Sequence, residues 1–231
     1  MITDSHGPDL TAYVHPTDAI DCDSPAVIQF ANDTSSGSRT DIDRAVALYH
    51  AVRDDFRYDP YRLDLTLQGM RASSTLAKGY GFCVPKAVLL AALARALHIP
   101  SRLGFADVKN HLVTKRLLEL MQTDLFVFHG YTELYLEGKW VKATPAFNKS
   151  LCQRFDVEPL AFDGRNDSVL QQSDRKGNEF MQYVRDRGTF ADLPLDELRA
   201  AFEQHYPSFM SGGNHDQTGV FEEEAPTQRE R

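Results

Sequence analysis

The sequence predicts a mixed fold of α-helices and antiparallel β-strands. The first observation is a helical recurrence of apolar residues after Thr40, every three or four positions. The second is an almost uninterrupted apolar run over 84–98, which is typical of a helix buried on most of its sides. The third is a pair of strand-like segments within 125–144 that meet at Glu137-Gly138, which predicts a tight β-hairpin.

Shorter signals place the remaining elements. Thr40 is a good N-cap, and proline disfavours helix at the residue before it, so Pro60 ends the helix that Thr40 starts. In chain order we expect a strand over 10–14, helices over 25–31 and 41–56, loop with a short helical turn over 64–80, the apolar helix over 84–98, a strand over 101–108, a helix over 110–121, the hairpin over 125–144, mostly loop over 155–178, a strand over 178–185 and a helix over 195–205.

The polar composition of the C-terminal residues sets the expected domain boundary. We expect one domain over 1–210, with its main motifs in 40–150. Residues 211–231 are rich in Gly, Asn, Asp, Glu and Gln, a composition that predicts a disordered acidic tail.

The overall composition favours a globular protein of a reducing compartment. With 231 residues, of which 42% are hydrophobic, the chain is long enough for one sizeable core. Its net charge of -8 disfavours nucleic-acid binding, and no stretch reaches the ~20 apolar residues that cross a bilayer. The acidic start does not resemble a signal peptide, and three sparse cysteines do not suggest a disulfide framework. We therefore expect a cytoplasmic protein that binds neither nucleic acid nor a membrane.

A cysteine at the start of the apolar helix is the strongest candidate for a catalytic residue. Cys83 follows the Gly-Tyr-Gly-Phe stretch 79–82. The free N–H groups of a first helical turn, together with the positive end of the helix dipole, stabilise a thiolate at such a position. The alternative is a small buried residue that opens a core helix. We favour a nucleophile because His129 follows on a predicted strand, where it can act as the base.

The hairpin turn predicts which residues face each other across the two strands. If the Glu-Gly pair forms the loop, Glu133 faces Lys142, and we expect a cross-strand ion pair between them. Because side chains alternate along a strand, Thr144 is then a diagonal neighbour of His129 on the same face.

A catalytic histidine needs a third group that fixes its tautomer and its orientation. The side-chain carbonyl of Asn148 can accept a hydrogen bond from an imidazole N–H, and Thr144 can accept one less strongly; the sequence leaves both open. For an oxyanion, the candidates are the backbone N–H of Cys83 and the side chains of Tyr80 and Gln68.

Three segments together resemble the transglutaminase-like superfamily. They are the cysteine segment 79–102, the histidine hairpin 129–145, and residues 52–59, which resemble the helix end before the family's active-site loop; the match covers roughly 40–150. The resemblance implies an α+β, papain-like fold in which the cysteine helix packs on an antiparallel sheet that carries the histidine. It also implies thiol acyl-transfer chemistry through a thioester, with no cofactor.

One position departs from the family pattern. The family usually has an aspartate just before the proline that ends the hairpin, and here that residue is Thr144. Two functions therefore remain. The first is an enzyme that hydrolyses a peptide, protein, small amide or ester substrate, or transfers its acyl group. The second is a catalytically weak or inactive binding protein. A metal site is the least favoured hypothesis, since the histidines and cysteines lack the spacing of metal ligands. Separately, His111 is a further candidate for the substrate site.

Overall fold

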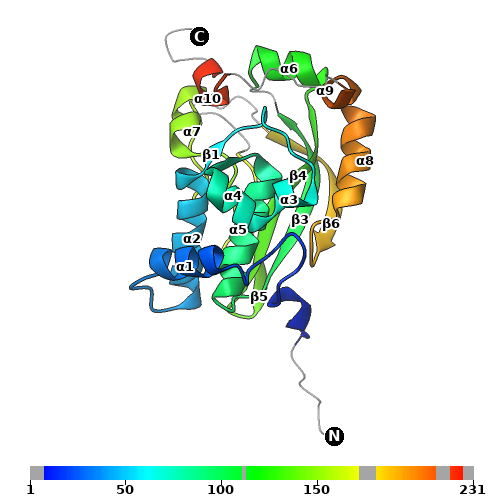
Figure 1. The fold of residues 1–231 in the computed structure, drawn as a ribbon. Coiled ribbons are helices and arrows are strands. Elements are labelled where there is room, and N and C mark those ends of the chain that lie inside the picture. The colour runs from blue at the N-terminus through cyan, green and yellow to red at the C-terminus, as the bar shows by residue number, and fades with distance from the viewer. Residues whose placement is uncertain (1–7, 111–112, 172–180, 212–218, 226–231) are drawn as a thin grey trace, which may run out of the picture.

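The computed structural model describes residues 8–110, 113–171, 181–211 and 219–225, and it confirms the α+β class (Figure 1). Four antiparallel strands form one sheet in the order β5-β4-β3-β6. Their bounds are β3 Ser101–Asn110, β4 Leu125–Leu136, β5 Lys139–Ala143 and β6 Met181–Phe190. Two further strands, β1 (Arg57–Tyr58) and β2 (Tyr80–Gly81), pair with each other in parallel.

The helices surround one central helix, α5, which packs on β3 and β4 and is flanked by α1, α2 and α4 (Figure 1). The described helices are α1 Pro25–Thr34, α2 Asp41–Asp55, α3 Leu67–Met70, α4 Ala72–Lys78, α5 Cys83–Ala96, α6 Lys115–Met121, α7 Lys149–Phe155, α8 Leu195–His205, α9 Pro207–Ser211 and α10 Phe221–Glu224, with a 3-10 turn at Thr11–Tyr13.

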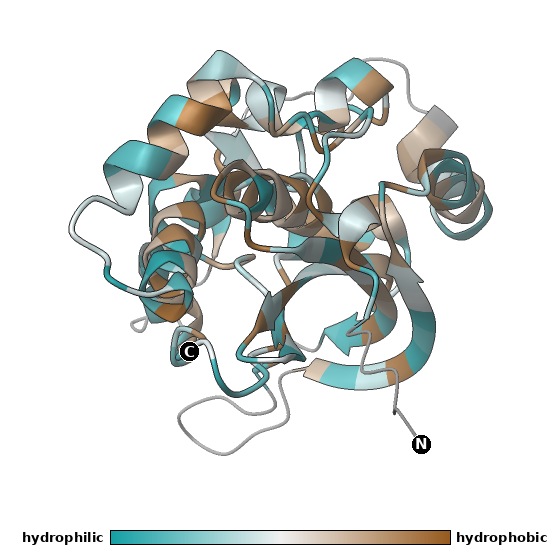
Figure 2. Cartoon of the chain, turned by 90° about the horizontal axis from the view of Figure 1, so that it is seen from below, coloured by the Kyte–Doolittle hydropathy of each residue, from teal (hydrophilic) through white to brown (hydrophobic). Residues whose placement is uncertain are grey.

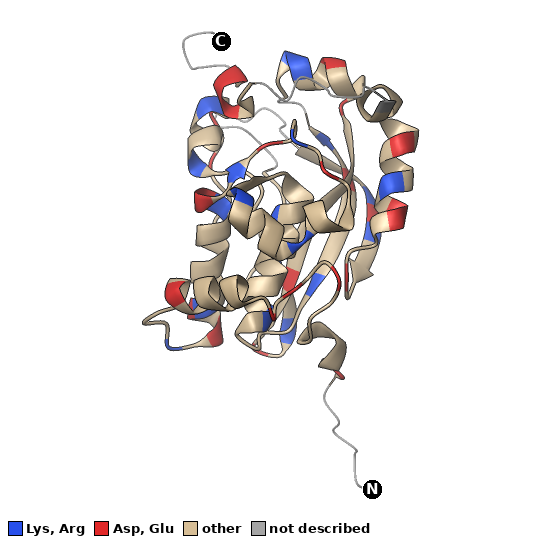
Figure 3. Cartoon of the chain, viewed as in Figure 1, with Lys and Arg blue, Asp and Glu red and all other residues tan. Residues whose placement is uncertain are grey.

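Helix α5 is the centre of the hydrophobic core. Every residue from Cys83 to Arg95 is buried, as the apolar run in the sequence predicts. In contrast, hydrophilic and charged residues lie mainly on the peripheral helices and strands (Figures 2 and 3). Removing this much apolar surface from water is the main stabilisation of the fold, and it fixes the start of α5 against the sheet.

One ionisable side chain inside this core, that of Lys86, is held by backbone carbonyls, and its burial lowers its pKa to about 7. The ammonium group of Lys86, which is 0% exposed, donates to the carbonyl oxygens of Arg53 at 3.0 Å, Phe56 at 2.6 Å and Ala146 at 2.7 Å. Arg53 and Phe56 lie at the C-terminal end of α2, where helix carbonyls lack intrahelical partners and carry partial negative charge. Lys86 therefore joins the end of α2, the first turn of α5 and the segment that follows β5.

Local signals for the helix start and the hairpin are confirmed. Thr40 caps α2 through a reciprocal capping box with Asp43. The hairpin turns at Glu137 and Gly138, whose φ angles are +48° and +84°, and Glu133 faces Lys142 as predicted. The prediction of an ion pair between those two residues is wrong.

Glu133 pairs instead with a residue of the neighbouring strand. Its carboxylate contacts the Arg102 guanidinium of β3 at 2.5 Å, and the Lys142 ammonium lies over the Tyr131 ring. An arginine opposite on β3 offers two N–H groups to the carboxylate, a geometry that a lysine cannot match.

Several expected elements differ in the structure. Residues 11–13 form a 3-10 turn in place of a strand, and 64–80 contain two short helices, α3 and α4. Within the expected disordered tail, the described residues 219–225 carry the helical turn α10 with Phe221 buried, and Ser211 ends α9. The other tail residues, 212–218 and 226–231, lie outside the described residues.

Replacing Lys86 by Met removes the ammonium and leaves three buried carbonyl oxygens without that donor. We expect Lys86→Met to lower the free energy of unfolding by about 3 kcal/mol or more, since each orphaned buried acceptor costs on the order of 1 kcal/mol or more. Urea unfolding measures the change. The matched control is Lys142→Met, which removes a charge from β5 and should shift stability by less than about 1 kcal/mol. Equal losses in the two variants would contradict the role of Lys86.

Candidate active site

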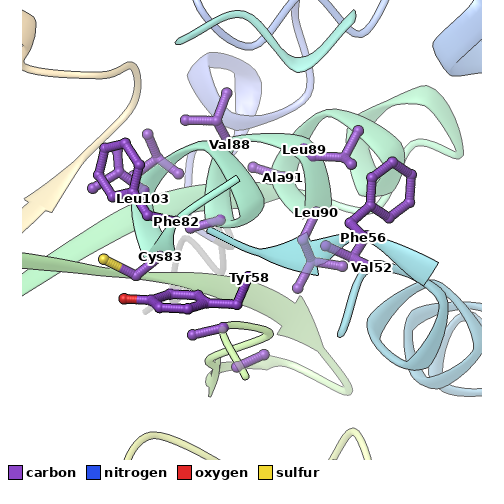
Figure 4. Packing of buried hydrophobic residues seen from close by; sticks show 14 of the residues in the cluster. Val52, Phe56, Tyr58, Phe82, Cys83, Val88, Leu89, Leu90, Ala91 and Leu103 are labelled. Carbon is purple, nitrogen blue, oxygen red and sulfur yellow. The ribbon is translucent and has the colours of Figure 1, made fainter. Parts of the chain in front are cut away.

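Cys83 is the first residue of α5, and strand β4 runs directly past it. Phe82 caps the helix with an extended backbone, so the thiol stands at the helix entrance beside the Tyr58 ring (Figure 4). A Cβ built on Gly130 of β4 would lie only 3.1 Å from the Cα of Val84, so glycine is needed for the strand to come this close. As a result the backbone N–H groups of Gly130 and Val84 can donate to the Cys83 sulfur.

The structure brings Cys83 and His129 to one cavity. Both side chains line a partly open, apolar cavity of about 40 Å³ at the start of α5. The remaining lining side chains are almost all hydrophobic or aromatic: Tyr58, Pro60, Leu63, Phe82, Leu117, Met121, Phe126, Val127, Phe202, Tyr206 and Phe209. The structure therefore places the predicted nucleophile and base in the lining of one cavity, and their catalytic roles stay a prediction.

The opposite side of His129 faces Thr144. Both residues line a second, smaller cavity of about 10 Å³, room for about one water molecule. The Thr144 hydroxyl is buried and has no hydrogen-bond partner among the described residues. Its backbone is held firmly, because its carbonyl accepts from the Tyr49 hydroxyl at 3.1 Å and its N–H donates to the Ser168 carbonyl. His129 thus lines both cavities, the first together with Cys83 and the second together with Thr144.

A bulge in β4 sets the position of His129. Ala106 pairs with His129 but Val108 pairs with Phe126, so β4 contains one extra residue at this point. Phe128 adopts φ +53°, a left-handed conformation that is costly for a bulky residue. The bulge leaves the Phe128 N–H outside the strand ladder, where it donates to the Asp107 carboxylate at 3.1 Å.

Asp107 is itself held by an arginine of the next strand. The Arg187 Nε of β6 donates to the same Asp107 oxygen at 2.5 Å, and its guanidinium lies over the Phe128 ring. The contacts of Asp107 and Arg187 stabilise the strained backbone directly before His129. The sequence carries no signal for this clamp, since its three residues come from three strands.

Burial determines the protonation of the pair. It raises the pKa of Cys83 to about 11, although the N–H groups of Gly130, Val84 and Cys83 act in the opposite direction. Burial also lowers the pKa of His129 to about 4. Both directions favour a neutral thiol beside a neutral imidazole over a thiolate–imidazolium pair. The thiolate expected from the helix dipole is therefore outweighed by desolvation in this buried arrangement.

Asn148 has other partners than His129. Its side-chain oxygen accepts from the Tyr58 N–H at 3.1 Å, and its amide nitrogen donates to the Ser150 hydroxyl at 2.7 Å and to the Glu222 carboxylate at 3.2 Å. The structure therefore places Asn148 as a support for Tyr58, and of the two orienting candidates it brings only Thr144 beside the imidazole.

The side-chain candidates for an oxyanion donor lie elsewhere. Tyr80 packs under the guanidinium groups of Arg57 and Arg62 and lines a different cavity, and Gln68 donates to Ser74. His111 lies outside the described residues. The backbone N–H of Cys83, at the helix entrance, remains in place for this role.

Sequence reasoning missed Tyr58 and the cover of the cavity. Tyr58 borders the thiol, and burial holds its pKa well above the usual value, so its hydroxyl stays protonated. The cover consists of side chains from α6, α8 and α9, whose apolar faces gave only generic helical signals. The segment 52–59, noted for its family resemblance, was the one available pointer to Tyr58.

The described residues hold neither a metal-binding cluster nor a membrane-spanning helix. No group of three or more His, Cys, Asp or Glu side chains is arranged to hold a metal ion in the described part of the chain. Among those same residues, no helix combines the length and apolar character needed to cross a bilayer. The three cysteines are free thiols.

Comparison with solved structures shows what the fold is similar to. The crystal structure of a putative cysteine protease from Cytophaga hutchinsonii superimposes with a TM-score of 0.52 at 17% identity, covering 83% of this chain and 50% of that one. The chain therefore spans about half the length of that protein. A putative protease from Parabacteroides distasonis gives a TM-score of 0.37 at 15% identity, over 55% of this chain and 26% of that chain. None of the curated proteins compared with the chain matches it.

The family comparison covers the two motifs on which the site depends. The profile of the Transglutaminase-like superfamily matches residues 28–145. This range is about half of the chain, and it contains Cys83, His129 and Thr144. The papain-like architecture, with a cysteine helix packed on an antiparallel sheet that carries the histidine, agrees with that match. The chain belongs to the transglutaminase-like superfamily.

Proposed function

We propose that this protein is a cysteine-dependent acyl-transfer enzyme that hydrolyses a peptide, amide or ester bond. The observation that carries the proposal is the shared cavity of Cys83 and His129, two residues far apart in the sequence. Membership of the superfamily supports the same chemistry. The identity of the substrate and the choice of water over an amine as acceptor belong to the proposal.

The arrangement supplies each step of such a reaction. His129 is neutral at pH 7, so it can accept the thiol proton as the Cys83 sulfur attacks a carbonyl carbon. The backbone N–H of Cys83 stabilises the oxyanion that forms. The carbon–nitrogen or carbon–oxygen bond then breaks, the imidazolium protonates the leaving group, and a thioester remains. Water attacks the thioester, its proton returns through His129, and the acid leaves with the thiol restored.

The cavity lining indicates which acyl groups fit. Leu117, Met121, Phe202 and Phe209 line the same cavity as the sulfur, and Cys83 is only 7% exposed. A substrate carbonyl reaches the sulfur only after some of these side chains move. Because the lining is apolar, an apolar residue or acyl chain next to the reacting carbonyl is the best match.

A second function is favoured by specific observations. The neutral Cys–His pair, its burial and Thr144 in the place of a carboxylate all suit a protein that keeps the fold and binds a ligand without turnover. The pH dependence of Cys83 alkylation separates the two. An apparent thiol pKa well below the ~8.5 of a free cysteine supports the enzyme, whereas a value at or above it supports the binding protein.

Removing the thiol tests the nucleophile. We expect Cys83→Ala to lower hydrolysis of a panel of apolar peptide amides and esters by at least ~10³-fold, because no other group forms the thioester. Iodoacetamide labelling at that position disappears as well. Cys22→Ala is the matched control, since Cys22 is 6% exposed against 7% for Cys83 and lies outside the cavity. Turnover that survives in Cys83→Ala would refute the assignment.

The depressed pKa of His129 predicts an acid-dependent loss of stability. Between pH 6.5 and 4 the unfolded chain takes up a proton on this imidazole that the folded chain does not, so stability decreases as the pH falls. His129 alone should lower the free energy of unfolding by about 3 kcal/mol over this range. Urea unfolding of the unaltered chain and of His129→Gln at pH 7 and pH 4 isolates this contribution. Parallel losses in the two proteins would exclude it.

Restoring a carboxylate beside His129 tests the importance of Thr144. We expect Thr144→Asp to raise the pKa of His129 and to stabilise the thiolate, so that alkylation of Cys83 at pH 7 becomes about tenfold faster or more. Thr144→Asn has a similar shape without the charge and should leave the rate near that of the unaltered protein. The same rate in both variants would show that residue 144 does not act on the pair.

A further inference from the structure

The described C-terminal segment 219–225 packs against aromatic and polar side chains, and the place it fills, here called the groove, is formed by Tyr58, Tyr61, Arg116, Asn148 and Phe155. Phe221 of this segment is 3% exposed and meets the Tyr58 ring at 5.6 Å and the Tyr61 ring at 5.5 Å, both edge-on. The Phe155 ring of α7 lies on a third side at 6.3 Å. Edge-to-face contacts of this kind are specific for an aromatic side chain.

The carboxylates that follow Phe221 are also recognised individually. Glu224 accepts from the Tyr61 hydroxyl at 2.5 Å and pairs with the Arg116 guanidinium of α6 at 2.8 Å. Glu222 accepts from the Asn148 amide at 3.2 Å. Figure 3 shows the acidic colour of α10 at the same end of the molecule as α6. The groove therefore makes specific contacts with a short motif, an aromatic residue followed by acidic residues.

This groove adjoins the thiol. Tyr58 forms its floor under Phe221, and the same ring lines the cavity of Cys83 (Figure 4). Asn148 connects the two as well, because it accepts from the Tyr58 N–H while it donates to Glu222. A polypeptide lying where α10 lies would thus contact Tyr58, whose ring also lines the cavity of Cys83.

Among the described residues, side-chain contacts hold helix α10 against the rest of the protein. It has only four residues, and a helix of this length has no stability of its own in water. It forms no strand pairing with the sheet. Its place depends on the contacts of Phe221, Glu222 and Glu224, and a second polypeptide with the same side chains can make the same contacts.

We propose that α10 occupies a polypeptide-binding groove next to Cys83, and that a segment of another protein, with an aromatic residue followed by acidic residues, binds there in exchange for α10. Use of the groove by a substrate rests on the proposed acyl-transfer function, but binding itself does not. The C-terminal segment then competes with that ligand for the groove, and its side chains indicate which side chains the ligand carries.

A binding experiment in trans tests the exchange. The probe is a fluorescein-labelled peptide of residues 219–225, and its binding is measured by fluorescence polarisation to the full chain and to a chain ending at residue 218. We expect the shortened chain to bind the peptide at least about tenfold more tightly, because the tethered segment of the full chain competes at high effective concentration. The peptide with Phe221→Ala should lose about tenfold or more in affinity.

Matched variants of the shortened chain locate the site. Arg116→Gln should weaken peptide binding severalfold, and Arg44→Gln, which removes an exposed arginine of α2 far from the groove, should not. A folded shortened chain that does not bind the peptide, or that binds the Phe221→Ala peptide equally well, overturns the proposal.

A second variant tests the proposal if the shortened chain is not folded, as judged by the loss of a cooperative unfolding transition. Glu224→Gln in the full chain weakens the docked segment at Tyr61 and Arg116 without exposing the aromatic floor by deletion. It should bind the peptide more tightly than the unaltered full chain, and equal affinity would overturn the proposal. Because every readout is binding, failure of catalysis by Cys83 leaves these outcomes unchanged.

Discussion

The buried ammonium of Lys86 is the interaction on which the geometry of the site depends. It is one helical turn beyond Cys83, and its three N–H groups end on carbonyls of two other segments. A compact ammonium with three donors suits this task better than a planar guanidinium. The end of α2, which continues into Tyr58, and Ala146, two residues beyond Thr144, are thereby tied to the helix that carries the thiol.

The site that results is organised but buried. His129 lines one cavity with Cys83 and a second cavity with Thr144, so the candidate base adjoins both the candidate nucleophile and the candidate orienting group. The same burial that creates this order removes the water that stabilises charge, and it therefore keeps the pair neutral. The placement of the residues and the activation of the thiol are therefore separate properties, since burial keeps both groups uncharged.

The elements predicted correctly from the sequence are those set by local rules. The Glu-Gly turn determines the register of the hairpin, and the uniform apolar run determines the burial of α5. The meeting of Cys83 and His129 followed from their places on those two elements. These predictions needed no knowledge of how distant segments pack.

The missed features depend on contacts between distant segments. Asn148 is adjacent to the hairpin in sequence. Its side-chain amide, however, is hydrogen-bonded to Tyr58 and Glu222, which lie far from it along the chain. The acidic composition of the tail predicts disorder, but the contacts of Phe221, Glu222 and Glu224 dock part of it. Short helices α3 and α4 within 64–80 lack the long periodicity that reveals a helix in sequence.

The bulge at Phe128 also has a consequence for the evolution of this strand. Alternation along β4 changes phase there, which lets Phe126, Val127 and His129 all reach the lining of one cavity. Loss of a single codon between these residues would restore regular pleating and turn the imidazole to the other face of the strand. The length of this stretch is therefore as strong a constraint on the site as the identity of His129.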